Sequence, residues 1–290
     1  MRHPRPARGA FGPECTGELP YAAQLLTALD RSTLLLADAA FDAFDFLGEV
    51  AATGAQFLVR SSARRCPTVG RRLPDGSYLA QLNGGYRLLP VRVVEAWVTV
   101  TLADGTARRV QWRLITSLLD HQRYPARELV DLYHERWQVE TTYFSIKATM
   151  LDGRVLRSRS LDGIDQEFYA LLTVYQALIP SAADIASTRP GLDMDRISFT
   201  VLLETAGDQV IVAAGIRPAR PVELVGAIGR AALAALWPAR RRPRIKARSR
   251  KNPTSKHSAN VGKHPQVAQS CSFHFEIAIL EDGLAPHRRR

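Results

Sequence analysis

The sequence predicts an α/β fold with a β-rich insertion and a helical C-terminal part, and three observations carry this prediction. An apolar strand, a helix and a second apolar strand follow one another within residues 33–60, which is the order of a βαβ unit. Three tight-turn dipeptides then separate runs rich in β-forming residues, at positions 75–76, 83–84 and 104–105. Residues 128–150 contain no Gly or Pro, and further apolar helical segments follow them.

The N-terminal part supplies the first half of the α/β core, which we place at residues 17–63 after a flexible lead-in at 1–16. Residues 18–30 predict a short amphipathic helix. The continuous apolar runs TLLLA and QFLVR, at residues 33–37 and 56–60, are typical of strands buried on both faces. Residues 42–53 predict the helix between these strands, and Gly54 closes it.

The β-rich insertion covers residues 64–117 and predicts strands at 86–93, 96–102 and 109–118. The last two strands form a hairpin around Asp104-Gly105. The second half of the α/β core then follows at residues 118–160, where Pro125 opens a long helix.

The C-terminal part divides into a helical region and a basic tail. Residues 161–237 predict helices at 165–179, 193–206 and 222–236, with Pro180 near the end of the first. The composition changes after Trp237, and we expect residues 238–290 to form a basic, disordered tail.

The excess positive charge is confined to one segment. Residues 224–275 contain eleven Lys and Arg and no Asp or Glu, whereas residues 1–223 contain 25 of each sign. A near-neutral body with a localised basic segment indicates a polyanionic partner. A solvated tail without a specific partner is the alternative, and for a basic tail alone it is equally plausible.

Two classes of protein are disfavoured by the composition. No run of 18 uncharged apolar residues exists, so we expect no membrane span, and no apolar region follows the basic N-terminus as in a secretory signal. The three cysteines are scattered, without disulfide framework or metal-ligand spacing. This usage fits a reducing cytoplasm.

The long helix carries an unusual polar stripe. On a regular helix Tyr133, Arg136, Glu140 and Lys147 fall within an arc of about 60°. A phenol, a guanidinium, a carboxylate and an ammonium on one stripe suit a phosphate-binding or catalytic surface. The alternative is an ordinary i, i+4 pair between Arg136 and Glu140 on a solvated face.

A second carboxylate, Asp38, follows a buried strand directly. A side chain at this position leaves the core and enters a cleft, and carboxylate oxygens such as those of Asp38 and Glu140 are ligands that Mg²⁺ prefers. A turn or helix N-cap is the alternative for Asp38.

The stripe matches a family signature. The spacing Tyr-x2-Arg-x3-Glu-x6-Lys resembles that of insertion-sequence DDE transposases of the IS-four type. Five stretches are also similar to that family: residues 34–60, residues 114–133, YHERWQVETTYFSIK around the signature, RVLRSRS at 154–160, and PRIK at 243–246. The resemblance spans roughly residues 12–250.

The resemblance implies a partial ribonuclease H-like core in which two aspartates and a glutamate hold two magnesium ions. By position, Asp38 is the second catalytic and metal-binding aspartate, and Glu140 is the glutamate. The resemblance further implies double-stranded DNA as partner, both transposon terminal repeats and target, a homodimer in the synaptic complex, and a nucleoid-associated location. The expected DNA-binding residues are Tyr133, Arg136, Lys147, Arg157, Arg159, Arg244 and Lys246.

Two departures from the family pattern are present. Ala39 and Ala40 stand where the family usually has Arg and Gly, and we expect Ala40 to strain the turn. Only some 30 residues precede the strand before Asp38, too few for the strands and helix that normally carry the first aspartate. We therefore expect an N-terminally truncated transposase that does not cut DNA alone. The alternatives are a non-catalytic DNA-binding remnant and an unrelated α/β protein with a basic tail.

Overall fold

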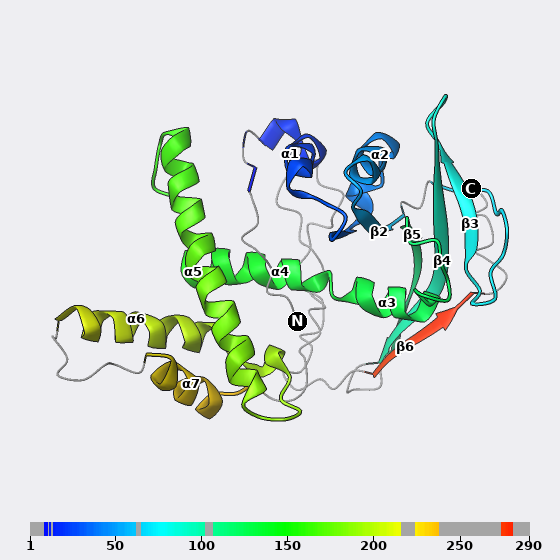
Figure 1. Cartoon of the computed structure of the whole chain (residues 1–290). Coiled ribbons are helices and arrows are strands. Elements are labelled where there is room, and N and C mark those ends of the chain that lie inside the picture. The colour runs from blue at the N-terminus through cyan, green and yellow to red at the C-terminus, as the bar shows by residue number, and fades with distance from the viewer. Residues whose placement is uncertain are drawn as a thin grey trace, which may run out of the picture.

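A computed structural model describes residues 9–10, 12, 14–61, 65–101, 107–215, 224–237 and 274–280. The described part forms a six-stranded sheet beside an arm of helices (Figure 1). The strands are β1 (Leu34–Ala37), β2 (Gln56–Arg60), β3 (Tyr78–Asn83), β4 (Leu88–Thr101), β5 (Ala107–Thr116) and β6 (His274–Ile279). The α-helices are α1 (Glu18–Gln24), α2 (Phe44–Ala52), α3 (Ala126–His134), α4 (Trp137–Phe144), α5 (Leu161–Ser187), α6 (Phe199–Gly215) and α7 (Leu224–Ala234). The short elements are η1 (Glu14–Thr16), η2 (Leu26–Ala28), η3 (Ala39–Phe41), η5 (Met194–Arg196) and the π-helical η4 (Ser145–Met150).

The first two strands form the parallel unit that the sequence predicts. β1 pairs in parallel with β2, Leu34 opposite Gln56 and Ala37 opposite Val59, and α2 connects them. Both strands are apolar because the sheet is covered on both faces. Val59 packs in the cluster that includes α2, whereas Leu58 packs in the cluster that includes α3. The predicted strand–helix–strand order is confirmed within two residues at each end.

The β-rich segment is confirmed, but its strand bounds differ from the prediction. β4 runs unbroken across residues 88–101, where two strands separated at 94–95 were predicted. Glu95 lies in the middle, 2% exposed, and its carboxylate accepts a 2.5 Å hydrogen bond from Arg113 on β5. Because Arg113 pairs with it, the buried carboxylate of Glu95 is compatible with an uninterrupted β4. β3 is an addition to the predicted strands, and its buried and less buried residues alternate with period two.

The β-rich segment shares one sheet with the first two strands. The strand order is β1-β2-β5-β4-β3, and β5 pairs antiparallel with β2, Val59 opposite Ile115. β2 therefore pairs with β1 on one side and with β5 on the other, which leaves neither of its edges unpaired. The domain boundaries at residues 64 and 117 stay a prediction.

Residues 274–279 correct the expected disordered tail, because they form β6. This strand pairs antiparallel with the second half of β4, Ala96 opposite Ile279, and lies beside α3. Ile277 is 9% exposed and joins the apolar cluster of Trp112, Tyr133 and the inner face of α3. The alternating residues of this segment are typical of a strand, but its partner lies about 180 residues earlier, and a local pattern does not identify that partner.

The C-terminal helices form an arm with a core of its own, built from Leu178, Ile185, Leu202, Ile228 and neighbouring residues. α5 runs through Pro180 to Ser187, so the helix predicted at 165–179 is longer at both ends than expected. α6 extends over residues 210–214, whose state the sequence left open.

α5 is also long and apolar enough to cross a membrane by length and composition, which is weak evidence since core helices pass the same test. The expected absence of a membrane span stays a prediction.

The long helix is interrupted. α3 ends at His134 and α4 begins at Trp137, and the amides of Glu135 and Arg136 donate to the carbonyls three residues earlier. A 3₁₀ turn advances about 120° per residue instead of about 100°, so α4 is rotated relative to the line of α3. The regular helix that the sequence predicts from Tyr133 to Lys147 is therefore broken after Tyr133, although Arg136 still contacts both Tyr133 and Glu140.

Candidate functional site

Tyr133 joins the end of α3 to the end of β1. Its side chain is 3% exposed, and its hydroxyl donates a 3.0 Å hydrogen bond to the carbonyl oxygen of Ala37. The ring stands edge-on to Trp112 of β5, with centroids 5.3 Å apart. The contact fixes the helix against the strand end that is followed by Asp38. The expectation that Tyr133 itself touches DNA stays a prediction, and its burial favours a positioning role.

Three charged side chains surround this phenol. Burial raises the pKa of the Tyr133 hydroxyl, Arg136 and Arg60 oppose the rise, and the carboxylate of Asp38 adds to it. The guanidinium of Arg136 lies 5.9 Å from the centre of the Tyr133 ring, and that of Arg60 lies 5.9 Å from the centre of Trp112. The charges of Asp38, Arg60 and Arg136 thus all act on the Tyr133 hydroxyl at the end of β1.

Asp38 caps the turn that follows β1. Its Oδ1 accepts a 2.8 Å hydrogen bond from the amide of Ala40, and it is the N-cap of η3. The capping alternative is therefore present, although it leaves the second carboxylate oxygen for another ligand. Ala40 lies in a 3₁₀ turn and is not among the described residues with positive φ, so the expected strain is not observed.

Glu140 contacts Arg136, as the i, i+4 alternative predicts. The closest guanidinium and carboxylate atoms are 3.4 Å apart, and the two side chains are 19% and 32% exposed. In the described ranges no group of three or more His, Cys, Asp or Glu side chains lies close enough to hold a metal ion. Asp38 and Glu140 are two of the three carboxylates that the resemblance implies for a two-magnesium site, so the described side chains match that site only in part. We derive no step through a metal from this arrangement.

The cations of the predicted stripe face outward after the interruption. Arg136 is partly exposed, and Lys147 is exposed on the π-helical η4. The ammonium of Lys147 lies 5.4 Å from the ring centre of Tyr143, one turn earlier. The structure thus places Arg136, Glu140 and Lys147 on the surface and Tyr133 in the core.

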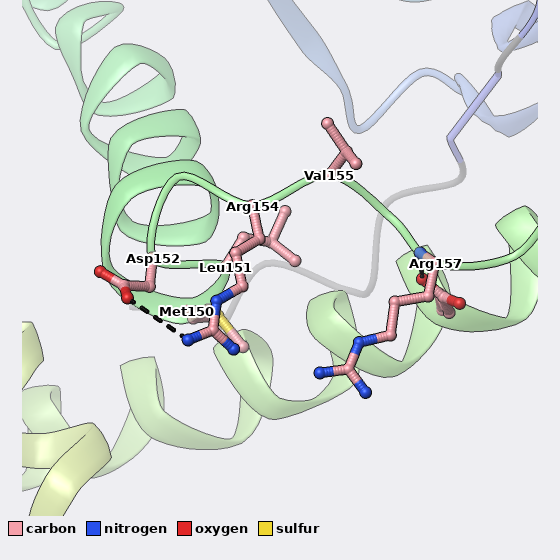
Figure 2. A pocket seen from close by; sticks show the side chains of 7 residues that line it. Met150, Leu151, Asp152, Arg154, Val155 and Arg157 are labelled. Carbon is pink, nitrogen blue, oxygen red and sulfur yellow. Dashed lines mark hydrogen bonds and ion pairs between the residues drawn. The ribbon is translucent and has the colours of Figure 1, made fainter.

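A basic loop follows η4. Arg154, Arg157 and Arg159 are exposed, and the first two line a hollow of about 240 Å³ (Figure 2). The carboxylate of Glu167 on α5 accepts hydrogen bonds of 2.7 Å from the amides of Arg157 and Ser158. Asp152 lies 3.9 Å from Arg154, so the loop is not uniformly positive. Two backbone bonds to one carboxylate fix the shape of the loop and leave its guanidinium groups toward solvent.

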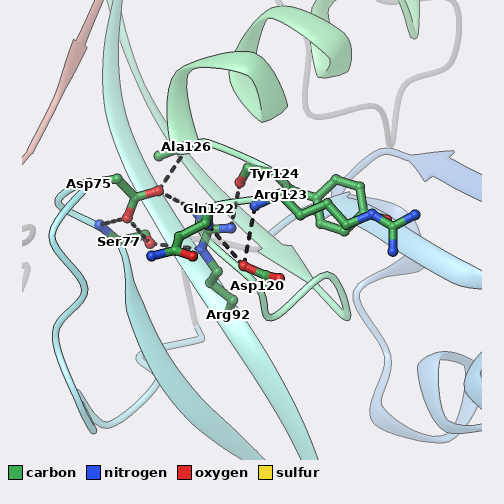
Figure 3. A network of polar contacts seen from close by, with 8 residues as sticks. All are labelled: Asp75, Ser77, Arg92, Asp120, Gln122, Arg123, Tyr124 and Ala126. Atoms are coloured by element: carbon green, nitrogen blue, oxygen red, sulfur yellow. Dashed lines mark hydrogen bonds and ion pairs between the residues drawn. The ribbon is translucent and has the colours of Figure 1, made fainter.

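A buried arginine fixes the start of α3. Arg92 is fully buried and donates to the hydroxyl of Ser77, the carbonyl of Tyr124 and the carboxylate of Asp75 (Figure 3). Asp75 in turn accepts a 2.9 Å hydrogen bond from the amide of Ala126, the first residue of α3. The turn before β3 and the loop before α3 are therefore held by the same ion pair.

The same contacts shift the pKa of Asp75. Burial alone would raise it, but the Ser77 hydroxyl, the Arg92 charge and the amides of Ala126 and Ser77 outweigh burial. The pKa of Asp75 therefore lies below its ordinary value, and its carboxylate is ionised at neutral pH.

Sequence reasoning missed three residues of this region. Arg60 ends β2 beside Asp38, a position that follows from the parallel register of β1 and β2. Trp112 and Arg92 come to this region only through strand pairing, so no local sequence pattern identifies them. The predicted DNA contacts Arg244 and Lys246 lie outside the described residues.

Comparisons with known proteins agree with the resemblance. The family model described as Transposase DDE domain matches residues 10–177, a range that includes both carboxylates and the basic loop. The chain is 27% identical over 227 residues to Transposase InsG for insertion sequence element IS4 of Escherichia coli (strain K12). The alignment covers 74% of this chain and 50% of that protein, so the chain spans about half the length of the curated relative it matches.

Proposed function

The chain belongs to the Transposase DDE domain family, and from this premise we propose that it binds double-stranded DNA at the ends of a mobile element. The binding surface is the outward face of α4 and η4 together with the basic loop at residues 154–160. Arg136 grips a backbone phosphate with its planar fork, and Lys147, Arg157 and Arg159 hold further phosphates. Phosphate contacts of this kind position the protein on the duplex.

One observation carries the proposal. The bond from Tyr133 to the carbonyl of Ala37 holds the end of α3, directly before Arg136, at the strand end that is followed by Asp38. The resemblance implies that the carboxylates of Asp38 and Glu140 act together at this end of the strands, and the guanidiniums of Arg60 and Arg136 would suit phosphate there. Tyr133 positions this edge from within the core.

For the chemistry we propose that this polypeptide alone does not cut DNA. Asp38 and Glu140 are the carboxylates of the predicted site, and the described part offers no cluster of three acidic or other metal-ligating side chains around them. Divalent metal chemistry, for which the resemblance implies magnesium, would then require a further carboxylate that joins this edge. The alternative is a non-catalytic DNA-binding remnant, which would also leave DNA uncut.

The experiment uses the full chain and duplexes that carry the sequences flanking its gene, with scrambled duplexes of equal length as controls. Fluorescence anisotropy at several salt concentrations should give tighter binding to the flanking sequences, with an affinity that falls steeply as salt rises. No binding at low salt would sink the proposal. Strand nicking in the presence of Mg²⁺ or Mn²⁺ would overturn the inactivity of this chain.

A homodimer that holds two DNA ends belongs to the same proposal. Sedimentation of the chain with and without duplex tests it, since a synaptic complex contains two protomers and two ends. A complex of one protomer per duplex at every concentration would count against the dimer but not against DNA binding.

A further inference from the structure

We infer that Arg65 is a positioning residue for the Asp38 carboxylate, on which it acts through Asp42 at the far end of the same turn. The inference rests on the proposed function, because that function gives the Asp38 carboxylate its role. It adds a residue outside the four-residue signature and outside the expected DNA contacts. In this assignment Arg65 holds the polypeptide behind Asp38 and does not itself touch the ligand.

The turn after β1 is short, and an aspartate stands at each of its ends. Asp38 is the N-cap of η3, where its Oδ1 accepts a 2.8 Å hydrogen bond from the amide of Ala40. Asp42 is the C-cap of the same element, which has only three residues. The amide of Phe41 also donates a 3.1 Å hydrogen bond to the carbonyl of Asp38. A displacement of Asp42 would therefore be passed through these few bonds to the Asp38 carboxylate.

Arg65 contacts both the side chain and the backbone of Asp42. Its Nε lies 2.7 Å from Oδ1 of the carboxylate, and its Nη2 donates a 3.1 Å hydrogen bond to the Asp42 carbonyl. The Asp42 side chain is 1% exposed, and its Oδ2 accepts a 3.1 Å hydrogen bond from the hydroxyl of Ser61. A buried carboxylate is costly to leave without its partners, so the position of Arg65 determines that of Asp42.

Strand β5 holds the segment that bears Arg65. The guanidinium of Arg113 donates a 2.6 Å hydrogen bond to the carbonyl of Arg65, and the carbonyl of Arg113 accepts a 2.7 Å hydrogen bond from the amide of Ser61. Arg113 is itself bonded to the buried carboxylate of Glu95 on β4. The β-rich segment thereby reaches the turn after β1, and Arg65 is the residue that makes the connection.

The alternative is an ion pair that adds to stability and positions nothing. The pair between Arg87 and Asp45 on α2 has the same closest distance of 2.7 Å, but its side chains are 68% and 79% exposed. An exposed pair of this kind contributes little to the fold. We favour a positioning role for Arg65 because its guanidinium bonds a backbone carbonyl of the turn as well as the carboxylate, and a planar fork with two contacts fixes a geometry.

The test replaces Arg65 by Lys, which keeps the charge. A lysine ammonium is a point charge without the planar fork, so it cannot hold the carboxylate and the carbonyl of Asp42 in the same geometry. Arg87→Lys is the matched control, because it makes the same substitution in an exposed ion pair of the same length. Asp42→Asn breaks the contact from the other side and should give the same local result as Arg65→Lys.

NMR of the free chain gives two local readouts, the carboxyl ¹³C signal of Asp38 and the hydrogen exchange of the Ala40 amide that bonds it. In Arg65→Lys the carboxyl signal should shift and the Ala40 amide should exchange about tenfold faster, because a hydrogen bond to a charged group is weakened. The amides of β2 should keep their exchange rates, and Arg87→Lys should change neither readout. The affinity of Arg65→Lys for the flanking duplex should stay within about twofold, since the charge is retained.

Each contrary outcome has a distinct meaning. If both readouts in Arg65→Lys match those of the unaltered chain, the inference is overturned. If the amides of β1 and β2 exchange faster by the same factor as Ala40, Arg65 only adds to stability, and the inference is again overturned. A loss of DNA affinity with unchanged readouts would make Arg65 a DNA contact instead. If the unaltered chain binds no DNA, the proposed function fails, whereas the readouts on the free chain still decide whether Arg65 positions Asp38.

Discussion

The hydroxyl of Tyr133 donates a hydrogen bond of 3.0 Å to the carbonyl oxygen of Ala37, across 96 residues of sequence. The bond links the last turn of α3 to the last residue of β1. The carbonyl of Ala37 directly precedes Asp38, and Arg136 follows Tyr133 closely, so this bond ties the segment before Asp38 to the segment before Arg136. The hydroxyl of Tyr133 therefore holds α3 against the end of β1.

Replacing Tyr133 by Phe should lower the free energy of unfolding by about 1 to 2 kcal/mol, because the buried carbonyl of Ala37 loses its side-chain donor. Urea unfolding of the two proteins measures the change. Tyr86→Phe, at a fully exposed tyrosine, is the control and should leave stability within about 0.5 kcal/mol. An equally small effect at Tyr133 would mean that the bond does not hold the helix.

Breaking the Arg92–Asp75 pair from either side should destabilise the chain strongly. Arg92→Met leaves the carboxylate without its partner, and Asp75→Asn leaves a fully buried guanidinium without a counter-charge, each at a cost of about 3 kcal/mol. The double variant should recover part of the loss, because no unpaired charge remains. Chemical denaturation of the four proteins gives the coupling, and strictly additive losses would contradict a direct interaction.

Acid should weaken the same contact. The pKa of Asp75 is lowered in the folded chain, so its contribution to stability is present above its ordinary value of 3.8 and is lost as pH falls through the folded value. The stability difference between the unaltered chain and Asp75→Asn should therefore be constant near neutrality and shrink below about pH 4. Unfolding curves at several pH values measure this difference. A stability difference that grows on acidification would contradict the lowered pKa of Asp75 in the folded chain.

The strand β6 should contribute to the stability of the region around Tyr133. Ile277→Ala removes an almost buried side chain from the cluster that contains Trp112 and Tyr133, and should cost about 2 kcal/mol. Ala278→Ser, at the exposed neighbouring position, is the matched control. Hydrogen exchange of β4 amides provides a second measurement, because loss of β6 would open the edge of β4. Unchanged stability and exchange in Ile277→Ala would mean that β6 does not pack there in solution.

The ion pair between Arg136 and Glu140 should be weak. Both side chains are partly solvated and their closest atoms are 3.4 Å apart, so a double-mutant cycle with Arg136→Gln and Glu140→Gln should give a coupling below about 0.5 kcal/mol. Such a small coupling would mean that these two side chains serve ligand binding and add little to the stability of the fold. A coupling above about 2 kcal/mol would instead assign them a structural role.

Residues close together in sequence allowed much of the fold to be predicted. The strands before Asp38 and at residues 56–60, the helix between them and the start of α3 after Pro125 follow from apolar runs and breaker residues. Errors arose where a distant partner decides the local state. Glu95 marks a break in the local pattern, yet Arg113 on the neighbouring strand keeps β4 continuous. Residues 274–279 alternate in polarity, but they stand alone within a basic tail, and pairing with β4 makes them a strand.

The sequence by itself determined the family, the order of the main elements and the residue types of the candidate site, because spacing and apolar periodicity are local properties. Only the tertiary structure decided which of these residues meet. Tyr133 is buried because α3 packs on the sheet beside the end of β1, whereas Tyr143 and Lys147 are exposed on an element that contacts α5 from its other side. The spacing of these residues in the sequence does not contain either packing contact.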